Sequence, residues 1–220
     1  MEIRRTANAG ILLTLDDVQI LLDGVCRQFF PYLPTPSAEV KKLSEPFPDV
    51  VAYTHIHEDH FDADYARRYC EQTGRPILST AQAARLIPDG VWTDAVYTAG
   101  RVKLTAVPTR HMGRWGLITD HRSFVVEGSR TVWFLGDASP NQMKQFSGLP
   151  KPDVLVVPYP YLSTPMALKV LENYLPCKIV LLHLPSREED PEGIWAAIVP
   201  GMEQLKQYLH VPMLSETIHL

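Results

Sequence analysis

Short apolar runs recur along the whole of this 220-residue sequence and limit the folds open to it. Each run is rich in β-branched or aromatic residues and is bounded by turn residues, so each predicts a β-strand. The runs are GILLTL, VQILLD, DVVAYTH, VKLTAVP, SFVVEG, TVWFLGD, DVLVVP and KIVLLH. Helices are expected between them, at residues 62–73, 79–87, 164–175 and 191–209, the third with Ser163 or Thr164 as N-cap and Pro165 in its first turn. This mixture indicates a layered α/β architecture.

Two stretches of the sequence resemble each other in layout. LLTLDDVQILLD ends in Asp23 and FVVEGSRTVWFLGD ends in Asp137, and each reads as two strands joined by a polar turn. A further apolar strand, introduced by Pro-Asp, then follows in both cases: PDVVAYTH and PDVLVVPY. The repetition suggests two facing sheets. The length favours one compact domain over residues 1–220.

Charge and composition exclude several classes of protein. The formal net charge of −4 gives no general attraction to phosphate backbones, so nucleic acid is not the expected partner. The sequence has no apolar run of the roughly 18 residues that a membrane span requires, and its N-terminus does not read as a signal peptide. Three separate cysteines, Cys26, Cys70 and Cys177, argue against a disulfide framework. We expect a cytoplasmic protein without membrane contact, and its oligomeric state stays open.

Three of the eight histidines lie within six positions, in HIHEDH at residues 55–60. His55 and His57 are two residues apart, so their side chains point to the same side if the preceding strand continues through them. That arrangement suits one metal ion. Asp59 and His60 follow at the start of a predicted helix, where they could serve a second ion. Imidazole nitrogen and carboxylate oxygen are usual zinc ligands.

Further metal-competent residues end other predicted strands. They are His111 after LTAVPTR, Asp137 after TVWFLG and His183 after KIVLL. Loops at the carboxyl ends of strands commonly build active sites, so these residues are candidates to complete a two-ion site. The other histidines match no motif and are expected at the surface or in packing; they are His121, His210 and His219.

In these motifs the sequence resembles the metallo-β-lactamase superfamily of hydrolases. The matching motifs occur in order and are LLDG with Asp23, HIHEDH, RH with His111, GD with Asp137 and LLHL with His183. The resemblance implies a four-layer αββα sandwich of two mixed β-sheets with a metal site along one edge. It also implies that Asp59, His60 and His183 hold one ion, that Asp137 bridges, and that the other ion is held by His55, His57 and His111. Asp23 would support the site without coordinating.

Details of the motifs favour zinc and indicate which branch of the family the sequence resembles. Diiron oxidoreductases of this fold usually have Glu at the position of His57, so two Zn²⁺ ions are expected, with Mn²⁺ or iron as alternatives. No cysteine lies near a ligand motif, unlike in the antibiotic-degrading enzymes. Residues 153–184 are similar to the ascorbate-6-phosphate lactonase-like branch, although STPM has an inserted proline. Phe61-Asp62 stands where many relatives have a small residue and glycine. The sequence therefore does not determine the shape of the pocket floor.

The expected function is that of a metal-dependent hydrolase. A water activated by the metal would attack a small ester, lactone or phosphodiester, with Asp59 orienting that water or taking its proton. The substrate would be a small, anionic molecule, and its contacts are predicted at Arg114, Trp115, Tyr159 and Tyr161. Two alternatives stay open: a non-catalytic zinc-binding module, and a mononuclear iron oxygenase of the same fold.

Overall fold

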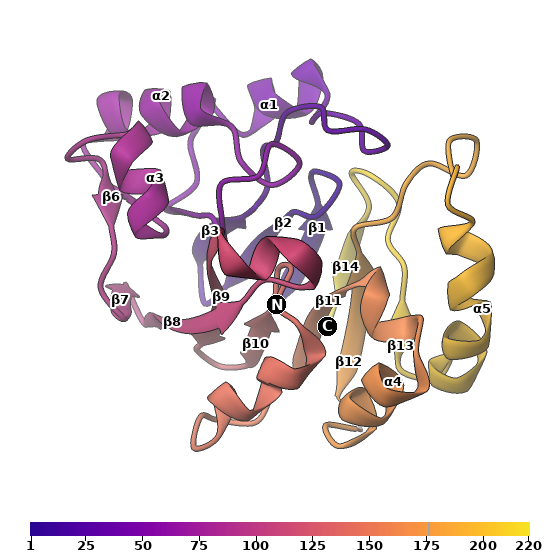
Figure 1. Cartoon of the computed structure of the whole chain (residues 1–220). Coiled ribbons are helices and arrows are strands. Elements are labelled where there is room, and N and C mark those ends of the chain that lie inside the picture. Colours follow the sequence, from indigo (N-terminus) through magenta and orange to yellow (C-terminus); the bar gives the residue numbers. More distant parts are fainter. Residues whose placement is uncertain (176) are drawn as a thin grey trace.

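The computed structural model describes residues 1–175 and 177–220 and contains two seven-stranded sheets (Figure 1). The first sheet has the order β14-β1-β2-β3-β4-β5-β6, with strands Thr217–His219, Glu2–Arg5, Ile11–Leu15, Val18–Leu22, Val50–Ala52, Ile77–Leu78 and Val91–Trp92. The second has the order β13-β12-β11-β10-β9-β8-β7, with strands Leu209–His210, Lys178–Leu182, Val154–Pro158, Thr131–Phe134, Asp120–Glu127, Val102–Arg110 and Val96–Ala99. Both sheets are mixed, as the sequence predicts.

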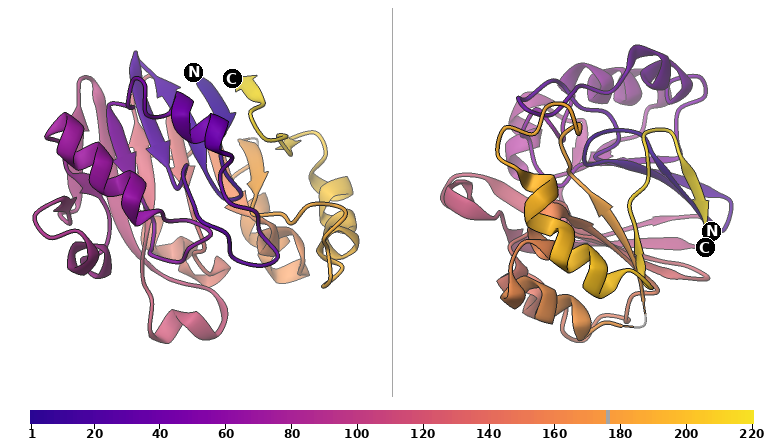
Figure 2. Two further views of the ribbon diagram at one scale, coloured as in Figure 1. Left: turned by 90° about the horizontal axis from the view of Figure 1, so that it is seen from above. Right: turned by 90° about the vertical axis from the view of Figure 1, so that its right-hand side faces the viewer.

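Helices cover the outer face of each sheet. Apolar side chains of α1 and α2 and of the residue that ends α3 pack on the first sheet, and those of α4 and α5 pack on the second. In Figure 2 (right) the purple helices lie above the strands and the orange helix α4 lies below them. The helices are Ser37–Lys42 (α1), Ala63–Thr73 (α2), Ala81–Leu86 (α3), Pro165–Glu172 (α4) and Ile194–Leu205 (α5). None of those in the described ranges combines the length and the apolarity needed to cross a bilayer. The predicted αββα order is therefore confirmed.

The core lies between the two sheets and explains the alternation within the strands. On β9, Phe124 and Val126 point into this core, whereas Val125 points to the helices. Leu13 on β2 and Phe134 on β10 enter the same core from opposite sheets. Because successive side chains of a strand face opposite sides, each sheet buries both of its faces and its strands read as nearly continuous apolar runs.

The two halves of the chain build their sheets in the same way. The hairpin β2–β3 is antiparallel and β4 then pairs parallel to β3; the hairpin β9–β10 is antiparallel and β11 then pairs parallel to β10. The repeated layout seen in the sequence is thus present in the sheet topology. The chain ends meet at a different place, where β14 pairs with β1 and brings the two termini together (Figure 2).

Every predicted strand and helix is present, and the sequence missed only short elements. The missed strands β1, β5, β6, β7, β13 and β14 have two to four residues, which is too short to show a clear alternation. The missed helix α1 has six residues. Thr164 is the N-cap of α4, where its side chain accepts from the Ala167 N–H at 3.2 Å, with Pro165 at the first position. The last helix begins later than predicted because Gly193, at φ +65°, precedes its first turn, and it ends at Leu205, before strand β13.

Three short 3₁₀ helices in the described part of the chain lie near the ends of the strands. They are Gly113–Leu117 (η1), Pro140–Phe146 (η2) and Tyr159–Leu162 (η3). Each begins a few residues after a strand of the second sheet, so each lies at the edge where β8, β10 and β11 end. The loops of that edge, together with those after β3 and β4, carry the predicted site.

Phe134 tests the core between the sheets, because its ring is 1% exposed and packs there. We expect Phe134→Ala to lower the free energy of unfolding by about 3–5 kcal/mol, through lost burial and the cavity that remains. The measurement is urea unfolding at fixed metal content. Leu117→Ala is the control, since Leu117 is 81% exposed and its loss should change stability by less than about 0.5 kcal/mol. Equal effects of the two substitutions would contradict this packing.

Candidate metal centre

The structure brings all the predicted ligand residues to one edge of the sandwich. His55, His57, Asp59 and His60 follow β4, His111 follows β8, Asp137 follows β10 and His183 follows β12. Strands β8, β10 and β12 run in the same direction, so their carboxyl ends meet at one edge of the second sheet. The loop after β4, from the first sheet, lies against that edge, since His60 lies 3.5 Å from Asp137 and the His55 ring lies 4.8 Å from that of His111. All but His57, which is half-buried, are buried.

Three histidines form the first cluster. His55 Nε2 lies 3.0 Å from His57 Nδ1, and the His111 ring centroid lies 4.8 Å from both other centroids. One nitrogen from each ring lies within 4.8 Å of the other two, which is close enough to share a single ion. Sequence spacing alone had paired His55 with His57, and the fold supplies the third nitrogen.

A mixed cluster of Asp59, His60 and His183 lies beside the first. His183 Nε2 is 3.0 Å from Asp59 Oδ2, and His60 Nε2 is 3.8 Å from the same oxygen. The three ligand atoms again lie within 4.8 Å of one another. Burial alone would raise the pKa of Asp59, but His60 and His183 outweigh it and lower that pKa below its ordinary value. The carboxylate therefore stays ionised.

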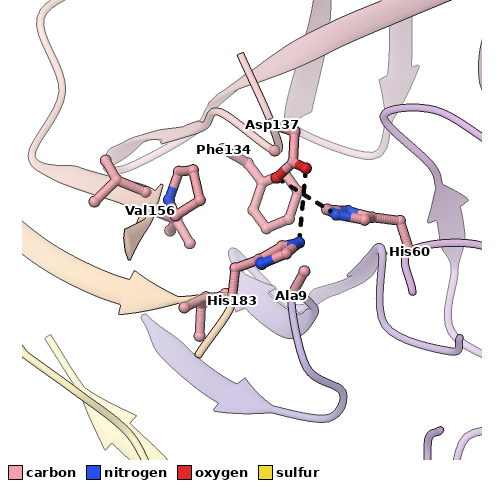
Figure 3. A pocket seen from close by; sticks show the side chains of 10 residues that line it. Ala9, His60, Phe134, Asp137, Val156 and His183 are labelled. Carbon is pink, nitrogen blue, oxygen red and sulfur yellow. Dashed lines mark ion pairs between the residues drawn. The ribbon is translucent and has the colours of Figure 1, made fainter. Parts of the chain in front are cut away.

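Asp137 lies between the two clusters. Its Oδ1 is 3.5 Å from His60 Nε2, and its Oδ2 is 3.4 Å from His111 Nε2 and 3.6 Å from His183 Nε2. Figure 3 shows the side chains of His60, Asp137 and His183 pointing toward one another. Burial opposes ionisation of Asp137, yet His183 and His60 hold the pKa of this carboxyl well below its usual range. A single carboxylate thus faces ligand nitrogens of both clusters.

Hydrogen bonds at the opposite ring nitrogens set the direction of the histidine rings. His60 Nδ1–H donates to Asp23 Oδ2 at 2.8 Å, and His111 Nδ1–H donates to the Met112 carbonyl at 2.7 Å. His55 Nδ1 lies 2.9 Å from Thr54 Oγ1, whose own hydroxyl donates to Asp23. With Nδ1 protonated and bonded outward, each of these rings in its neutral form directs the lone pair of its Nε2 into the site. This is how proteins fix metal-binding histidines.

The atoms that face the middle of the site lack partners of their own. Among the described residues no hydrogen-bond partner reaches four of these buried atoms: His60 Nε2, His111 Nε2, His183 Nε2 and Asp137 Oδ1. The 3.0 Å approach of His183 to Asp59 does not have the geometry of a hydrogen bond. Buried polar atoms are normally paired, so such a group of orphaned nitrogens and oxygens requires a ligand. Imidazole and carboxylate together fit a divalent metal site.

The protonation of the histidines agrees with that fit. Burial lowers the pKa of His57 to about 4 and that of His55 well below its ordinary value, so both rings are neutral at physiological pH. His60 differs: burial lowers its pKa, but Asp137 and Asp59 outweigh burial and raise it well above the ordinary value. The second cluster therefore favours a positive charge between its carboxylates, which a bound cation supplies.

Asp23 supports the site and does not point into it. Its carboxylate is fully buried and accepts from the Thr54 N–H at 2.7 Å, from the Thr54 hydroxyl at 2.6 Å and from His60. Burial raises its pKa, while His60 and Thr54 act in the opposite direction. Asp23 also has a ligand atom close to those of His55 and His60. Because its oxygens are already occupied, we assign it to orientation of His60.

Left-handed backbone conformations occur at the strand ends that hold the site. His183 has φ +63° and Asp23 has φ +48°, although neither is glycine. Such residues cost on the order of 1 kcal/mol or more and persist where surrounding contacts determine them. The His183 N–H donates to the Asn8 carbonyl at 3.1 Å, which fixes that turn. Gly136 has φ +54°, and a Cβ there would lie 2.6 Å from Thr54 Cγ2, so only glycine fits before Asp137.

Three of the four predicted substrate-contact residues lie around the site, and one does not. The Trp115 ring is 5.4 Å from the His57 ring, and the exposed Arg114 guanidinium stacks on Trp115 at 5.1 Å. The Tyr159 ring is 6.2 Å from the His183 ring. Tyr161, by contrast, is fully buried in the core and donates to the Ala138 carbonyl at 3.0 Å. The prediction of a substrate contact at Tyr161 is therefore wrong.

The question left by Phe61-Asp62 is resolved by packing. Phe61 is 4% exposed and its ring lies 4.8 Å from that of Tyr53 in the core under α2. Asp62 is the N-cap of α2 and accepts from the N–H groups of Asp64 and Tyr65, each at 2.9 Å. Asp62 thus starts the helix that follows the ligand loop, and Phe61 anchors the end of that loop in the core.

Sequence reasoning missed several residues that contact the ligand histidines. Tyr32 is buried with its ring 4.4 Å from that of His183, and Thr119 Oγ1 lies 3.1 Å from His57 Nε2. Neither occurs in a motif. His121 is buried, with its ring 5.2 Å from that of His55. The sequence signal that could have found His121 is its spacing from Ser123: the two residues are two positions apart on one strand, so both polar side chains share one face of the sheet.

The two remaining histidines lie away from this site. His210 Nε2 is 2.9 Å from Glu216 Oε1, and its side chain is 43% exposed. His219 Nδ1 is 3.3 Å from Glu2 Oε1, and its side chain is 72% exposed. Both agree with the prediction that these histidines take part in surface or packing contacts.

A comparison with protein families identifies the fold. The family model described as Beta-lactamase superfamily domain matches residues 2–170, and the chain belongs to this superfamily. None of the curated proteins matches the sequence. The ascorbate-6-phosphate lactonase-like branch is not singled out by these comparisons.

Solved structures share the whole architecture at low sequence identity. A possible metal-dependent hydrolase from Veillonella parvula has a TM-score of 0.77 at 18% identity, covering 100% of this chain and 99% of that one. An isothiocyanate hydrolase from Delia radicum gut bacteria has a TM-score of 0.76 at 17% identity, covering 100% and 99%. CmlA, a diiron beta-hydroxylase from Streptomyces venezuelae, has a TM-score of 0.70 at 16% identity, covering 100% and 54%. These similarities show the fold.

Replacing Asp23 by asparagine should weaken metal binding without removing a ligand. Asp23 Oδ1 accepts from the Thr54 N–H, and Oδ2 accepts from the His60 N–H and the Thr54 hydroxyl. An amide has only one accepting atom, so its NH₂ group opposes either the Thr54 N–H or the His60 N–H, and each clash disturbs the loop that orients the His60 ring. We expect Asp23→Asn to lower metal affinity about 10–100-fold, measured by competition with a chromogenic chelator. Asp16→Asn is the control, because Asp16 contacts the Ser129 N–H far from the site. Unchanged affinity in Asp23→Asn would contradict the supporting role.

Proposed function

We propose that this protein is a hydrolase that uses two divalent metal ions, zinc in the first place, to cleave a small ester, lactone or phosphodiester. The observation that carries the proposal is the position of Asp137, whose carboxylate faces His60 and His183 on one side and His111 on the other. A carboxylate in that position suits a shared ligand of two ions. Seven ligand side chains for two ions leave a coordination position for water, which favours catalysis over a closed structural site.

The ligands divide as the family resemblance implies. His55, His57 and His111 would hold one ion, Asp59, His60 and His183 the other, and Asp137 would contact both. When bound, such ions supply Lewis acidity toward the electrophilic oxygen and lower the pKa of water to roughly 7. The protein contributes rings fixed in one tautomer and a buried edge in which charge is weakly screened.

Asp59 is the proposed catalytic residue. Its carboxylate is 4% exposed and remains ionised at neutral pH, since His60 and His183 lower its pKa. A carboxylate in that state can orient the attacking water through a hydrogen bond and accept its proton. Its neighbour His183 limits how far the Asp59 side chain can move, because Oδ2 and Nε2 are 3.0 Å apart.

The surroundings of the site favour a small, anionic substrate. Trp115 is 38% exposed beside His57 and offers an aromatic face, and Arg114 stacked on it offers a cation. Tyr159, near His183, lies on the side of the second cluster and has a hydroxyl that can donate. Burial raises its pKa, so that the phenol stays protonated. A small substrate that carries an ester, lactone or phosphodiester group and one negative charge matches this aromatic face, cation and hydroxyl donor.

The proposal also covers the domain organisation, the cellular location and the class of substrate. We propose a single domain over residues 1–220, acting in the cytoplasm on a free small molecule, since a net charge of −4 favours no nucleic-acid partner. A lactonase-like chemistry is supported by the order of β11, η3, α4 and β12 before His183. The isothiocyanate hydrolase of the same fold adds isothiocyanates to the substrates to be tried.

Iron is the alternative metal. The diiron beta-hydroxylase shares this fold, and nitrogen and carboxylate ligands also bind iron. His57 at the position where diiron relatives usually have Glu supports zinc. The metal content of the purified protein distinguishes the two, and an iron-loaded protein that consumes O₂ would indicate an oxygenase.

Asp59→Asn tests the catalytic assignment with little change in volume. We expect turnover to fall about 10²–10⁴-fold, because the amide cannot accept a proton. The measurement is the turnover number of the fully metallated variant on the best substrate of an ester, lactone, phosphodiester and isothiocyanate panel. Asp64→Asn, an exposed acid on the following helix, should keep full activity. Full turnover in the metallated Asp59→Asn variant would contradict the assignment of Asp59 as the catalytic residue.

Metal removal tests the class of protein. We expect two ions per chain by elemental analysis, loss of hydrolysis after chelation, and recovery when Zn²⁺ is returned to the apoprotein. The reason is that the buried nitrogens and carboxylates cannot activate water without a cation between them. Tight, stoichiometric metal without hydrolysis of any substrate in the panel would instead support the non-catalytic zinc-binding module.

A further inference from the structure

His121 contacts the proposed bridging residue without belonging to either ligand cluster. The backbone N–H of Asp137 donates to His121 Nε2 at 3.0 Å. His121 lies on β9, is 6% exposed, and its ring is 5.8 Å from that of His111. Since its Nε2 lone pair accepts from the Asp137 N–H, this nitrogen cannot also coordinate a metal.

A chain of hydrogen bonds fixes the protonation of the His121 ring. His121 Nδ1 is 2.8 Å from Thr109 Oγ1, which is 3.2 Å from Ser123 Oγ, and Ser123 Oγ is 2.8 Å from the Leu135 carbonyl oxygen. The carbonyl can only accept, so the Ser123 hydroxyl donates to it. Ser123 Oγ then accepts from the Thr109 hydroxyl, and Thr109 Oγ1 accepts from His121 Nδ1–H. His121 Nε2 is therefore unprotonated, and its lone pair accepts the hydrogen bond from the Asp137 backbone N–H.

The sheet register places these groups next to one another. Thr109 on β8 is opposite His121 on β9, and Val107 is opposite Ser123. The side chains of residues 121 and 123 share one face of β9, since they are two positions apart. The chain of hydrogen bonds therefore joins the neighbouring strands β8 and β9 to the segment after β10, where Leu135 and Asp137 lie.

The backbone of Asp137 is held from both sides. His121 accepts its N–H, and its carbonyl accepts from the Met112 N–H at 2.9 Å. The preceding Gly136 adopts φ +54° without a side-chain penalty, so the orientation of the Asp137 peptide depends on these two hydrogen bonds. A small rotation of this peptide would move the carboxylate relative to His60, His111 and His183, which are all within 3.6 Å of its oxygens.

We propose that His121 is a positioning residue for Asp137, and that the chain from Leu135 through Ser123 and Thr109 holds its ring in the Nδ1–H tautomer. In this role it sets where the carboxylate lies between the two clusters. The inference rests on the proposed function, because the benefit of a fixed Asp137 is a well-formed two-ion site. It adds a residue that matches no sequence motif.

Two substitutions of His121 separate positioning from packing. In His121→Gln the amide oxygen can accept the Asp137 N–H in place of Nε2, and the amide nitrogen can donate toward Thr109; His121→Leu fills similar space and can do neither. We expect His121→Leu to lower the affinity for the more weakly bound ion about 10–100-fold by chelator competition. His121→Gln should remain within a few-fold of the wild type, and so should the control His210→Leu.

Cobalt substitution and thermal unfolding complete the comparison of variants. The visible spectrum of the Co²⁺-loaded protein should change in His121→Leu and be restored in His121→Gln, since it reports the ligand geometry and not the stability of the fold. Equal losses in both His121 variants, or no loss in either, would overturn the positioning role. A drop in melting temperature with unchanged Co²⁺ spectra and affinity would assign His121 to packing alone.

The tautomer is tested on the wild-type chain, without any substitution. Long-range ¹H–¹⁵N NMR correlations of the imidazoles in the metal-free protein should show His121 protonated at Nδ1 and unprotonated at Nε2. A proton on Nε2 would overturn the proposal, because that nitrogen could not accept from Asp137. If the wild-type chain binds no divalent ion, the proposed function fails, while this measurement still decides whether the hydrogen-bond chain exists.

Discussion

The buried carboxylate of Asp23 is the interaction on which the metal site depends. It accepts from the Thr54 N–H and hydroxyl and from His60, and Thr54 in turn accepts from His55. One acid at the end of β3 thereby fixes the start of the ligand loop after β4 and two of its rings. Removal from water makes this carboxylate costly unless all its bonds are made, which explains why its surroundings are so fully determined.

The same principle operates in the second sheet with different groups. The backbone of Asp137 is held by His121 and Met112, and the turn at His183 is held by the Asn8 carbonyl. In both halves, the residue at the strand end has a left-handed conformation or follows one: Asp23, Gly136 and His183. The packed sandwich supplies the rigid contacts that keep the unfavourable conformations of the non-glycine residues Asp23 and His183, and the ligand atoms are oriented before any ion binds.

Electrostatics explain why the buried cluster needs a cation. Asp59 and Asp137 remain ionised beside His60, whereas burial keeps His55 and His57 neutral. In the described parts of the chain, four buried atoms that face the site have no hydrogen-bond partner: His60 Nε2, His111 Nε2, His183 Nε2 and Asp137 Oδ1. A positive charge satisfies the carboxylates and the lone pairs together. This arrangement fits a divalent metal ion, and Trp115 and Arg114 are exposed at the rim of the site.

The sequence alone predicted the longer strands, the main helices and the candidate ligand residues, because each depends on local pattern: apolar runs, the Thr164 cap and the spacing of HIHEDH. It could not determine which ring nitrogen faces the metal, since that depends on partners such as Asp23 and Met112 from other strands. Tyr161 shows the same limit: its neighbour Tyr159 lies near His183, but packing buries Tyr161 in the core. His121 acquired its role only when the sheet register placed it opposite Thr109 and beside Asp137, because hydrogen bonds between distant residues follow from tertiary structure.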